Sequence, residues 1–325
     1  MNIFAYKLKF LTPVHFGAAE LGGKLEAINF CYSSDTLFSA LCCELAGSEF
    51  FSKFVDAVAQ GKILLSDLLP YTKEKFYLPK PILLVENAKK VQRVSLDEVR
   101  KQSTQRKKQK KMEYLRAANL KKYLASLRGG ESFFESANFG VEGLTQKVSC
   151  RAEEPLPYYV SEFSFNENSG LYLIAMFDDK NFSDTFAEIL KLLGLSGIGG
   201  KRSSGLGKFN LAEKINLNVS CANEDLNAVQ KMLTAENSIW QMTISSILPM
   251  AEDIPILKNS YYRLKKRGGF VTGGNFDKKK NSVYLIGAGS CLPKRIEGRA
   301  VILDKIDGVE IFRFGKGIFL GLDYE

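Results

Sequence analysis

A glycine-rich run that also holds two cations and two hydroxyls is the segment best equipped for chemistry. Residues 196–209 read SGIGGKRSSGLGKF, with two Gly-x-Gly pairs, Gly197/Gly199 and Gly205/Gly207. The pairs flank a core of Gly200, Lys201, Arg202, Ser203 and Ser204. Glycine adopts positive φ and lets another backbone approach closely. Cations, hydroxyls and backbone N–H groups together are suited to phosphate. The run therefore predicts a phosphate-binding loop.

The order of the neighbouring elements narrows the choice of phosphate ligand. Apolar residues at helical spacing precede the loop, and residues 206–212 after it have the pattern of a strand. A dinucleotide-binding loop has the reverse order, with the strand first and the helix second. A P-loop is also excluded, because Arg202 follows Gly200-Lys201 where Ser or Thr should hold the metal. A basic loop between helix and strand points to a nucleic-acid backbone.

Enzymatic candidates are few. The chain has one histidine, His15, which acts either as a general acid or base in RNA cleavage or as a structural or RNA-binding group. Cleavage also requires a second positioned group, which the sequence does not identify. We assign Asp35 to a helix cap and Asp178-Asp179 to a turn. We therefore expect a non-catalytic protein that has neither cofactor nor metal.

Two further stretches are candidates for nucleic-acid contact. Arg267, Gly268, Gly269 and Phe270 combine a cation, close-approach glycines and an aromatic ring that could stack on a base. The alternative is a glycine-rich hairpin with Phe270 in the core. Residues 136–157 read as a loop, and Arg151 within it is a third candidate.

The elements that must position these residues follow the order β-α-β-β-α-β. Residues 3–11 alternate as a half-buried strand, and a helix begins at 34–36. Residues 82–85 form a short strand, and 171–177 are a nearly continuous apolar run typical of a central strand. The next helix spans 184–193, capped by Ser183 and ended by Gly194, and the strand 206–212 completes the set.

A second set of elements follows a polar stretch at 216–227. Strands are predicted at 240–248, 282–286, 299–303 and 312–322, with a short helix at 253–259. The sequence therefore predicts an α+β fold with two ferredoxin-like (RRM-like) domains in tandem. Their ranges are 1–215, with the glycine loop at 197–207 and an insertion at 86–157, and 216–325.

Composition is consistent with an intracellular globular protein that has a polyanionic partner. The 325 residues are 45% hydrophobic, the net charge is +9 and the isoelectric point is about 9.1. None of the six cysteines forms a CxxC pair, so we expect reduced thiols of a cytoplasmic protein. No apolar run approaches the ~18 residues of a membrane span, so no membrane contact is expected.

The positive charge is concentrated in residues 89–128. This segment has fourteen Lys or Arg against three acidic residues, a net charge of +11, so the rest of the chain is slightly acidic. A helix with a flexible basic stretch is predicted, because Gly and Pro are absent until Gly129. Two interpretations remain open, a solvated insertion or an electrostatic arm on RNA.

An ordered series of motifs resembles the RAMP superfamily of CRISPR RNA-binding proteins. Besides the glycine loop, the motifs are LTPVHFG at 11–17, SSDTLFSAL at 33–41, YLPKP at 77–81, YYVSEFSF at 158–165, GLY at 170–172 and RGGF at 267–270. Within that superfamily they resemble the subunit of type III-A (Csm) complexes that holds the 5′ end of the guide RNA. The resemblance covers residues 1–85 and 135–325.

This resemblance implies a non-catalytic subunit that caps the 5′ handle of the crRNA. The glycine loop would offer backbone N–H groups, Lys201 and Arg202 to phosphates, and a protruding hairpin, or thumb, near 86–157 would displace a base. The implied protein partners are the large palm-domain subunit and the neighbouring backbone RAMP subunit. The alternatives are a RAMP endoribonuclease that acts through His15 and the equivalent subunit of type III-B complexes.

Overall fold

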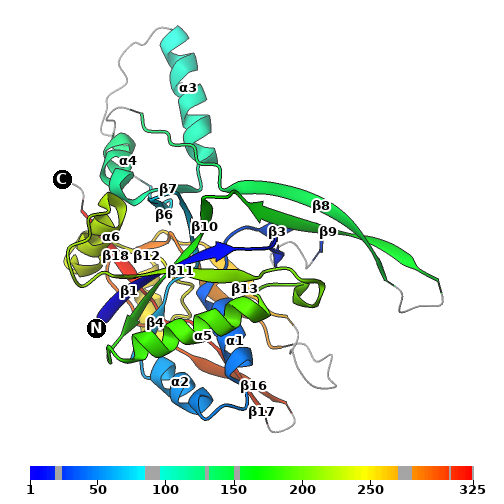
Figure 1. Cartoon of the computed structure of the whole chain (residues 1–325). Coiled ribbons are helices and arrows are strands. Elements are labelled where there is room, and N and C mark those ends of the chain that lie inside the picture. Colours follow the sequence, from blue (N-terminus) through cyan, green and yellow to red (C-terminus); the bar gives the residue numbers. More distant parts are fainter. Residues whose placement is uncertain are drawn as a thin grey trace.

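The computed structural model describes residues 1–18, 24–84, 96–128, 132–149, 154–269, 280–306 and 309–323. Within these ranges the chain is a mixed α+β protein that contains several antiparallel sheets (Figure 1). None of the helices in these ranges is long and apolar enough to cross a membrane.

The largest sheet has seven strands in the order β11-β1-β10-β5-β6-β7, with β4 also paired to β10. Every neighbouring pair is antiparallel. The strands are β1 (Asn2–Phe10), β4 (Ile63–Leu65), β5 (Leu69–Thr72), β6 (Lys75–Pro79), β7 (Tyr114–Arg116), β10 (Ser169–Phe177) and β11 (Phe209–Asn216).

Strand β10 lies at the centre of this sheet and is buried on both faces. Leu171, Leu173 and Ala175 face one apolar core, whereas Tyr172 and Ile174 face another. Strands buried on both faces read as continuous apolar runs instead of alternating ones. The prediction of a central strand at 171–177 is therefore confirmed.

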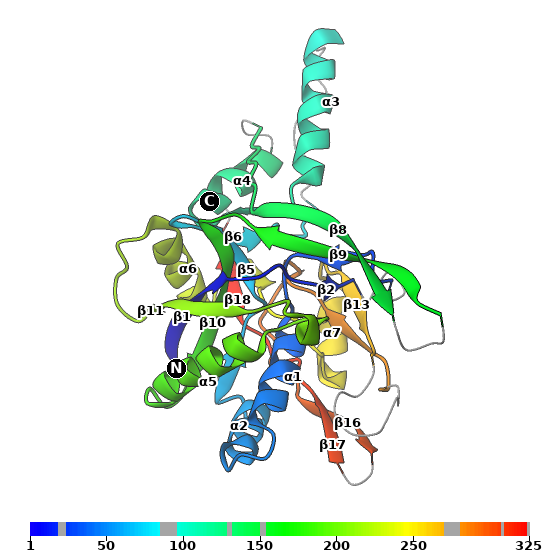
Figure 2. The same cartoon turned by 45° about the vertical axis from the view of Figure 1, so that its right-hand side comes forward.

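The helices cover the two faces of the sheet. Helices α1 (Ser34–Leu45), α2 (Phe50–Ala59) and α5 (Phe182–Ser196) pack on the first core. Helices α4 (Leu120–Leu127) and α6 (Glu224–Thr234) pack on the second. Helix α3 (Leu96–Lys111) projects from the body, as Figures 1 and 2 show. The short elements are α7 (Ile254–Leu257) and the 3₁₀ turns η2 (Ala117–Asn119), η3 (Arg202–Ser204) and η4 (Ala251–Asp253).

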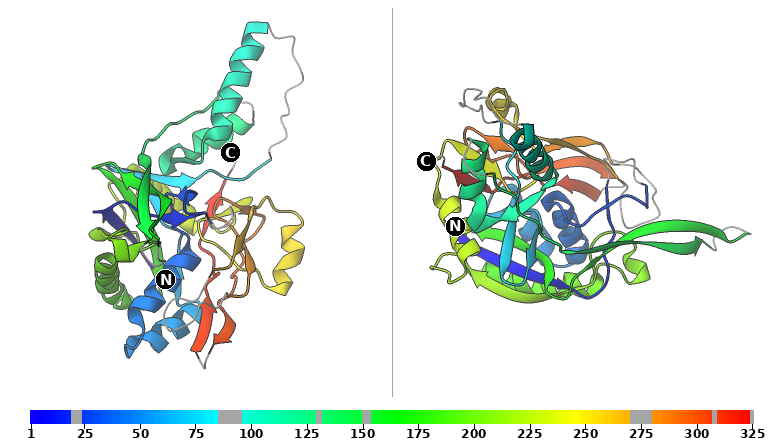
Figure 3. Two further views of the ribbon diagram at one scale, coloured as in Figure 1. Left: turned by 90° about the vertical axis from the view of Figure 1, so that its right-hand side faces the viewer. Right: turned by 90° about the horizontal axis from the view of Figure 1, so that it is seen from above.

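The remaining strands form one small sheet and four hairpins. The sheet has the order β15-β12-β18, from Cys291–Leu292, Trp240–Thr243 and Phe319–Leu322. The hairpins are β2 (Phe16–Gly17) with β3 (Ile28–Asn29), β8 (Gly140–Ser149) with β9 (Leu156–Phe165), β13 (Leu264–Arg267) with β14 (Val283–Ile286), and β16 (Val301–Ile306) with β17 (Val309–Arg313). Hairpin β16–β17 lies beside α1 in the views of Figures 2 and 3.

Residues 1–215 and 216–325 share a core. Tyr172 on β10 belongs to the same apolar cluster as Leu226 on α6 and Leu320 on β18. The buried Asp225 on α6 adds a polar link, because its carboxylate bonds Arg116 on β7 and the backbone N–H of Phe76 on β6. The two halves therefore form one packed body.

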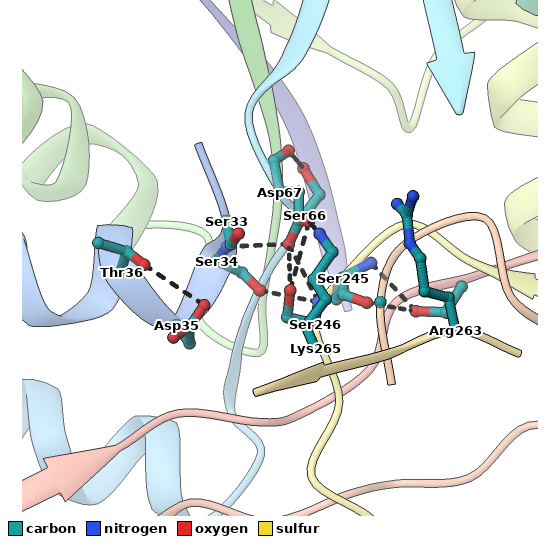
Figure 4. Close-up of polar contacts among 12 residues, drawn as sticks. Ser33, Ser34, Asp35, Thr36, Ser66, Asp67, Ser245, Ser246, Arg263 and Lys265 are labelled. Atoms are coloured by element: carbon teal, nitrogen blue, oxygen red, sulfur yellow. Dashed lines mark hydrogen bonds and ion pairs between the residues drawn. The ribbon is translucent and has the colours of Figure 1, made fainter. Parts of the chain in front are cut away.

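A second buried polar cluster, called here the serine joint, connects α1 to the C-terminal half (Figure 4). The Asp67 carboxylate accepts the backbone N–H of Ser34 at 2.9 Å and that of Ser246 at 3.0 Å. Lys265 on β13 lies 3.8 Å from the same carboxylate. Ser245 Oγ donates to the carbonyl of Leu65 at 2.9 Å. The joint fixes β13 relative to the start of α1.

Several predicted boundaries are wrong. Residues 82–84 of the predicted strand 82–85 are not the second strand, and residue 85 lies outside the described residues. Strands β4 and β5 take that place, and Ile82 makes an isolated bridge to Ser290. Helix α5 does not end at Gly194 but continues to Ser196. Gly194 lies inside the helix, where it packs closely against the backbone of Phe209 on β11. Ser183 lies within the first turn of α5, and its Oγ donates to the carbonyl of Lys180.

The predicted and observed elements of the C-terminal half differ where the chain turns, because the hydrophobic pattern of the sequence does not reveal these turns. The predicted strand 312–322 is interrupted between β17 and β18, and α6 begins within the polar stretch assigned to 216–227.

The loop predicted at 136–157 is also wrong, because residues 140–149 and 156–165 pair as a long hairpin. Strand β8 is exposed along nearly all of its length, so it lacks the alternation that marks a half-buried strand.

The basic segment 89–128 divides into two parts. Its first described part is the projecting helix α3. Its second part packs into the body, because Leu115, Leu120 and Leu124 are buried in the core that also holds α6. The prediction of a helix is confirmed for 96–111, whereas residues 112–127 are part of the folded core.

Candidate nucleic-acid interface

The glycine loop between α5 and β11 docks on the turn that follows β1. Gly200 donates its N–H to the carbonyl of His15 at 2.8 Å, and Gly207 donates to Pro13 at 2.9 Å. A Cβ on Gly199 would lie 2.8 Å from the carbonyl oxygen of His15, and one on Gly207 would lie 2.0 Å from that of Ile198. Both glycines have positive φ. The loop therefore needs glycine for docking as well as for its turns.

Much of the loop backbone is already hydrogen-bonded within the protein. The N–H groups of Gly197, Gly200, Gly205 and Gly207 donate to carbonyls of Leu193, His15, Arg202 and Pro13 respectively. These four N–H groups are therefore not free to bind phosphate, in contrast to the expectation for the glycines. What the loop offers a ligand is the guanidinium of Arg202, which lines a cavity beneath it.

We call this space the cation cavity. Its volume is about 500 Å³, and the glycine loop, the turn after β1, the start of α1, β13 and β17 all contribute to its wall. Four cationic side chains line it: Arg202, Arg267, Lys280 and Arg313. Glu310 is the acidic residue in the described lining. The start of α1 adds the hydroxyls of Ser33 and Thr36 to the wall.

A buried carboxylate holds two of these cations in place. Asp35 on α1 is fully buried, and its Oδ2 lies 2.9 Å from Nη1 of Arg313. Its Oδ1 lies 3.5 Å from Nε of Arg267. Arg267 also donates to the hydroxyl of Ser33. Asp35 makes no side-chain bond that caps α1, so the predicted capping role is wrong. Its role is to position the two arginines.

Two cations of this cavity, Arg313 and Lys280, are shielded from water. Arg313 is 5% exposed, and its Nε has no hydrogen-bond partner in the described part of the chain. Burial lowers the pKa of Lys280, and the nearby charge of Arg313 lowers it further. Clustered, desolvated positive charge raises the free energy of the empty site. An anion that enters the cavity would relieve this repulsion.

His15 lies in the wall of the same cavity. It is 5% exposed, and its Nδ1 lies 2.8 Å from the carbonyl oxygen of Ser161 on β9. A carbonyl only accepts hydrogen bonds, so Nδ1 carries a proton. The ring therefore ties the turn after β1 to the long hairpin and leaves Nε2 as its second polar atom.

Lys201 points elsewhere. It is not part of the cavity lining; its Nζ lies 3.3 Å from the hydroxyl of Tyr158 on β9 and 4.6 Å from the centroid of that ring. Its φ of 59° is positive, which is uncommon for a residue other than glycine. Lys201 therefore links the glycine loop to hairpin β8–β9.

Hairpin β8–β9 extends from the body, as Figure 1 shows. It presents exposed apolar side chains along its length: Val141, Leu144, Val148, Leu156 and Tyr159. Apolar side chains on a protruding hairpin are suited to insertion between bases or into another protein.

A second hollow, called here the adjoining cleft, continues from the cation cavity. Its volume is about 370 Å³, and it shares Tyr32, Ser33 and Arg267 with that cavity. Further cations line it: Lys80, Lys110, Arg263 and Lys265. Asp67 and Glu113 offset part of this charge. A row of positive charge therefore leads from the glycine loop to the end of α3.

Six of the predicted site residues come together in the cation cavity: His15, Gly199, Gly200, Arg202, Arg267 and Gly268. Gly197, Ser203, Ser204, Gly205, Gly207 and Gly269 do not line it. Arg151 and Phe270 lie outside the described residues. Sequence reasoning missed Lys280 and Arg313, because isolated cations in a strand or loop carry no local signal of a shared site.

The sequence has clear relatives among CRISPR proteins. The family model described as CRISPR Csm4 C-terminal domain matches residues 236–322. The Csm4 protein of Streptococcus thermophilus is 31% identical over 327 residues, which covers 98% of this chain and 99% of that protein. The Csm4 protein of Mycobacterium tuberculosis is 27% identical and covers 99% of this chain and 98% of its own.

Solved structures show the same fold. The chain matches one from a Csm3-Csm4 subcomplex of a type III-A CRISPR-Cas interference complex with a TM-score of 0.62 and 18% identity, over 99% of this chain and 100% of that one. It matches one from a Csm1-Csm4 cassette in complex with cA4 with a TM-score of 0.60 and 18% identity, over 100% and 99% of the two chains.

Proposed function

This chain belongs to the Csm4 family of CRISPR proteins, and on that premise we propose that it binds and caps the 5′ handle of the crRNA in a type III-A complex. One observation carries the proposal: four cations from separate parts of the chain converge on a single cavity below the glycine loop. The cavity suits phosphates of a single strand, and its Tyr32, Phe16 and His15 walls suit splayed bases.

The arrangement of the body supports the predicted RAMP architecture. The first half has the order β1-α1-β4/β5-β10-α5-β11, and β10 lies between β1 and β5 as a split βαβ unit requires. We interpret residues 1–215 as a ferredoxin-like domain and 216–325 as a second, more irregular one built around β15-β12-β18. The serine joint and the shared core would hold the two domains as a rigid clamp.

Hairpin β8–β9 is the natural candidate for the thumb. It protrudes beside the glycine loop, and the contact between Lys201 and Tyr158 couples the two. Its exposed apolar side chains would displace a base where the handle meets the guide. The protein partners we propose are the large palm-domain subunit and the neighbouring backbone subunit. Mass spectrometry of the native assembly, with its RNA, tests whether both partner subunits are present.

The first prediction distinguishes the two cations of the glycine loop. Arg202→Ala should weaken handle binding by about tenfold, since a charge-assisted contact is worth roughly 1.5 kcal/mol or more. The slope of log affinity against log salt should fall by about 0.7, the value for one phosphate of single-stranded RNA. The measurement is fluorescence anisotropy with the handle RNA at several salt concentrations.

Two variants of the same loop make this test specific. Lys208→Ala removes an exposed lysine that does not line the cavity and should leave both quantities unchanged. Lys201→Ala should act through the hairpin contact, with a smaller loss. Unchanged affinity and slope in a folded Arg202→Ala variant would remove the cavity from the RNA site.

The second prediction separates a binding subunit from an enzyme. The purified chain should leave guide precursor intact, with or without divalent metal, because His15 Nδ1 is committed to Ser161 and the site offers no assigned second catalytic group. His15→Ala should alter binding or stability only. Gel analysis of end-labelled precursor tests this. Cleavage at a defined position that disappears in His15→Ala would favour the endoribonuclease alternative.

A further inference from the structure

Helix α3 is rich in charged residues and poor in apolar ones. Its sixteen residues include seven Lys or Arg against Asp97 and Glu98, and its apolar residues are Leu96 and Val99. A helix without an apolar stripe cannot be held by core packing. Figures 1 and 2 show α3 standing away from the body accordingly. Packing on the core therefore does not explain why α3 carries so many exposed cations.

The base of α3 is anchored to the body. Lys80 Nζ donates to the carbonyls of Gln109 and Lys110 at 3.1 and 3.0 Å, a favourable arrangement for a cation at a helix C-terminus. The Gln109 amide donates to the hydroxyl of Ser126 at 3.0 Å. The anchored end is the one that borders the adjoining cleft, because Lys110 and Lys80 both line it. The charge on α3 thus continues the row of cations that begins at the glycine loop.

The last turns of α3 carry the densest charge. Lys107, Lys108, Lys110 and Lys111 are all exposed, and Lys107 and Lys111 are separated by one helical turn. Like charges at this spacing destabilise a helix by a few tenths of a kcal/mol per pair. A polyanion laid along this face would neutralise the repulsion and release its own counterions.

We propose that α3 is a second RNA-binding surface, which binds the phosphate backbone of single-stranded RNA without regard to sequence. RNA is favoured over an acidic protein because the cations of α3 are continuous with those of the cleft and the cation cavity. The surface is distinct from the handle site, because the sixteen residues of α3 include neither a glycine nor an aromatic residue that could read a base. It would hold RNA that extends beyond the handle.

Three lysines of α3 provide the test. Lys107→Gln, Lys108→Gln and Lys111→Gln together should lower the salt slope for oligouridine by about 2, at ~0.7 for each lost phosphate contact. The matched control replaces three other exposed lysines with Gln: Lys53, Lys62 and Lys180. They lie near α2 and the start of α5, at the other end of the body. That control changes net charge equally and should leave the slope unchanged.

The outcome can be separated from that of the handle site. The α3 variant should keep its preference for handle RNA over oligouridine, whereas Arg202→Ala should reduce that preference by up to about tenfold, in line with its loss of handle binding. Circular dichroism checks that α3 remains helical. An oligouridine slope equal to that of the control variant would overturn the proposal, and so would an α3 variant that lost only an acidic protein partner.

Discussion

Replacing Asp225 with alanine should lower the free energy of unfolding by about 3 kcal/mol. Asp225 is fully buried, and its carboxylate accepts from Nε and Nη2 of Arg116 at 3.2 and 3.1 Å. It also accepts the backbone N–H groups of Phe76 and Ala118 at 3.1 and 3.0 Å. Alanine would leave these donors without their acceptor, and removal of one partner of a buried ion pair typically costs ~3–5 kcal/mol. The lower end is expected because Arg116 is partly exposed.

The neighbouring residue supplies a matched control. Glu224 lies on the same helix and bonds the same arginine at 3.2 Å, but its side chain is 75% exposed. Glu224→Ala should therefore cost no more than about 0.5 kcal/mol. Urea denaturation of both variants measures the difference. Equal effects would mean that α6 and the sheet are not held together through Asp225.

The sequence predicts those parts of the fold in which a local pattern of apolar residues follows directly from burial. The unbroken apolar run of β10 reflects burial on both faces, and the stripe of Leu37, Phe38 and Leu41 in α1 reflects one core. The glycine loop is legible for the same reason: positive φ and close approach to His15 and Ile198 require glycine at fixed positions. The family resemblance read from these motifs is confirmed by the relatives.

What the sequence did not reveal depends on contacts between distant residues. Arg313 and Asp35 lie 278 positions apart, so neither the ion pair nor the position of Arg313 in the cavity has a local signature. Asp35 at a helix start has the pattern of a cap, yet its carboxylate is buried against an arginine. Strand β8 of the long hairpin is exposed along nearly all of its length and therefore lacks the alternation by which strands are recognised.

The basic segment shows how composition can hide two structures. Charge dominates residues 89–128, and Leu115, Leu120 and Leu124 are among the few apolar residues between the charges. They do pack, because α4 needs only one apolar face against α6 and the sheet. Deletion of the whole segment would therefore remove part of the core, and only substitutions on α3 can test its charge.

Replacing Gly207 with alanine should destabilise the protein by about 3 kcal/mol and weaken handle binding in the fraction that folds. Its φ is 79°, a conformation that costs an L-residue roughly 1–2 kcal/mol. In addition, a Cβ would lie 2.0 Å from the carbonyl oxygen of Ile198, so the backbone itself would have to move. Because Gly207 and Ile198 close the base of the loop, that movement would displace Arg202 from the cavity.

A substitution at Gly205 separates the cost of the positive φ from the cost of the clash with Ile198. Its φ of 83° is nearly the same, but a Cβ there would meet no atom within 4 Å among the described residues. Gly205→Ala should therefore cost only the conformational term, about 1 kcal/mol, and leave handle affinity within about twofold. Thermal unfolding and anisotropy on both variants, below their melting temperatures, measure the two effects. If Gly205→Ala were as damaging as Gly207→Ala, strain in the turn would matter more than the fit of the loop against Ile198. If neither variant changed handle binding, the shape of the glycine loop would not determine where Arg202 meets the RNA.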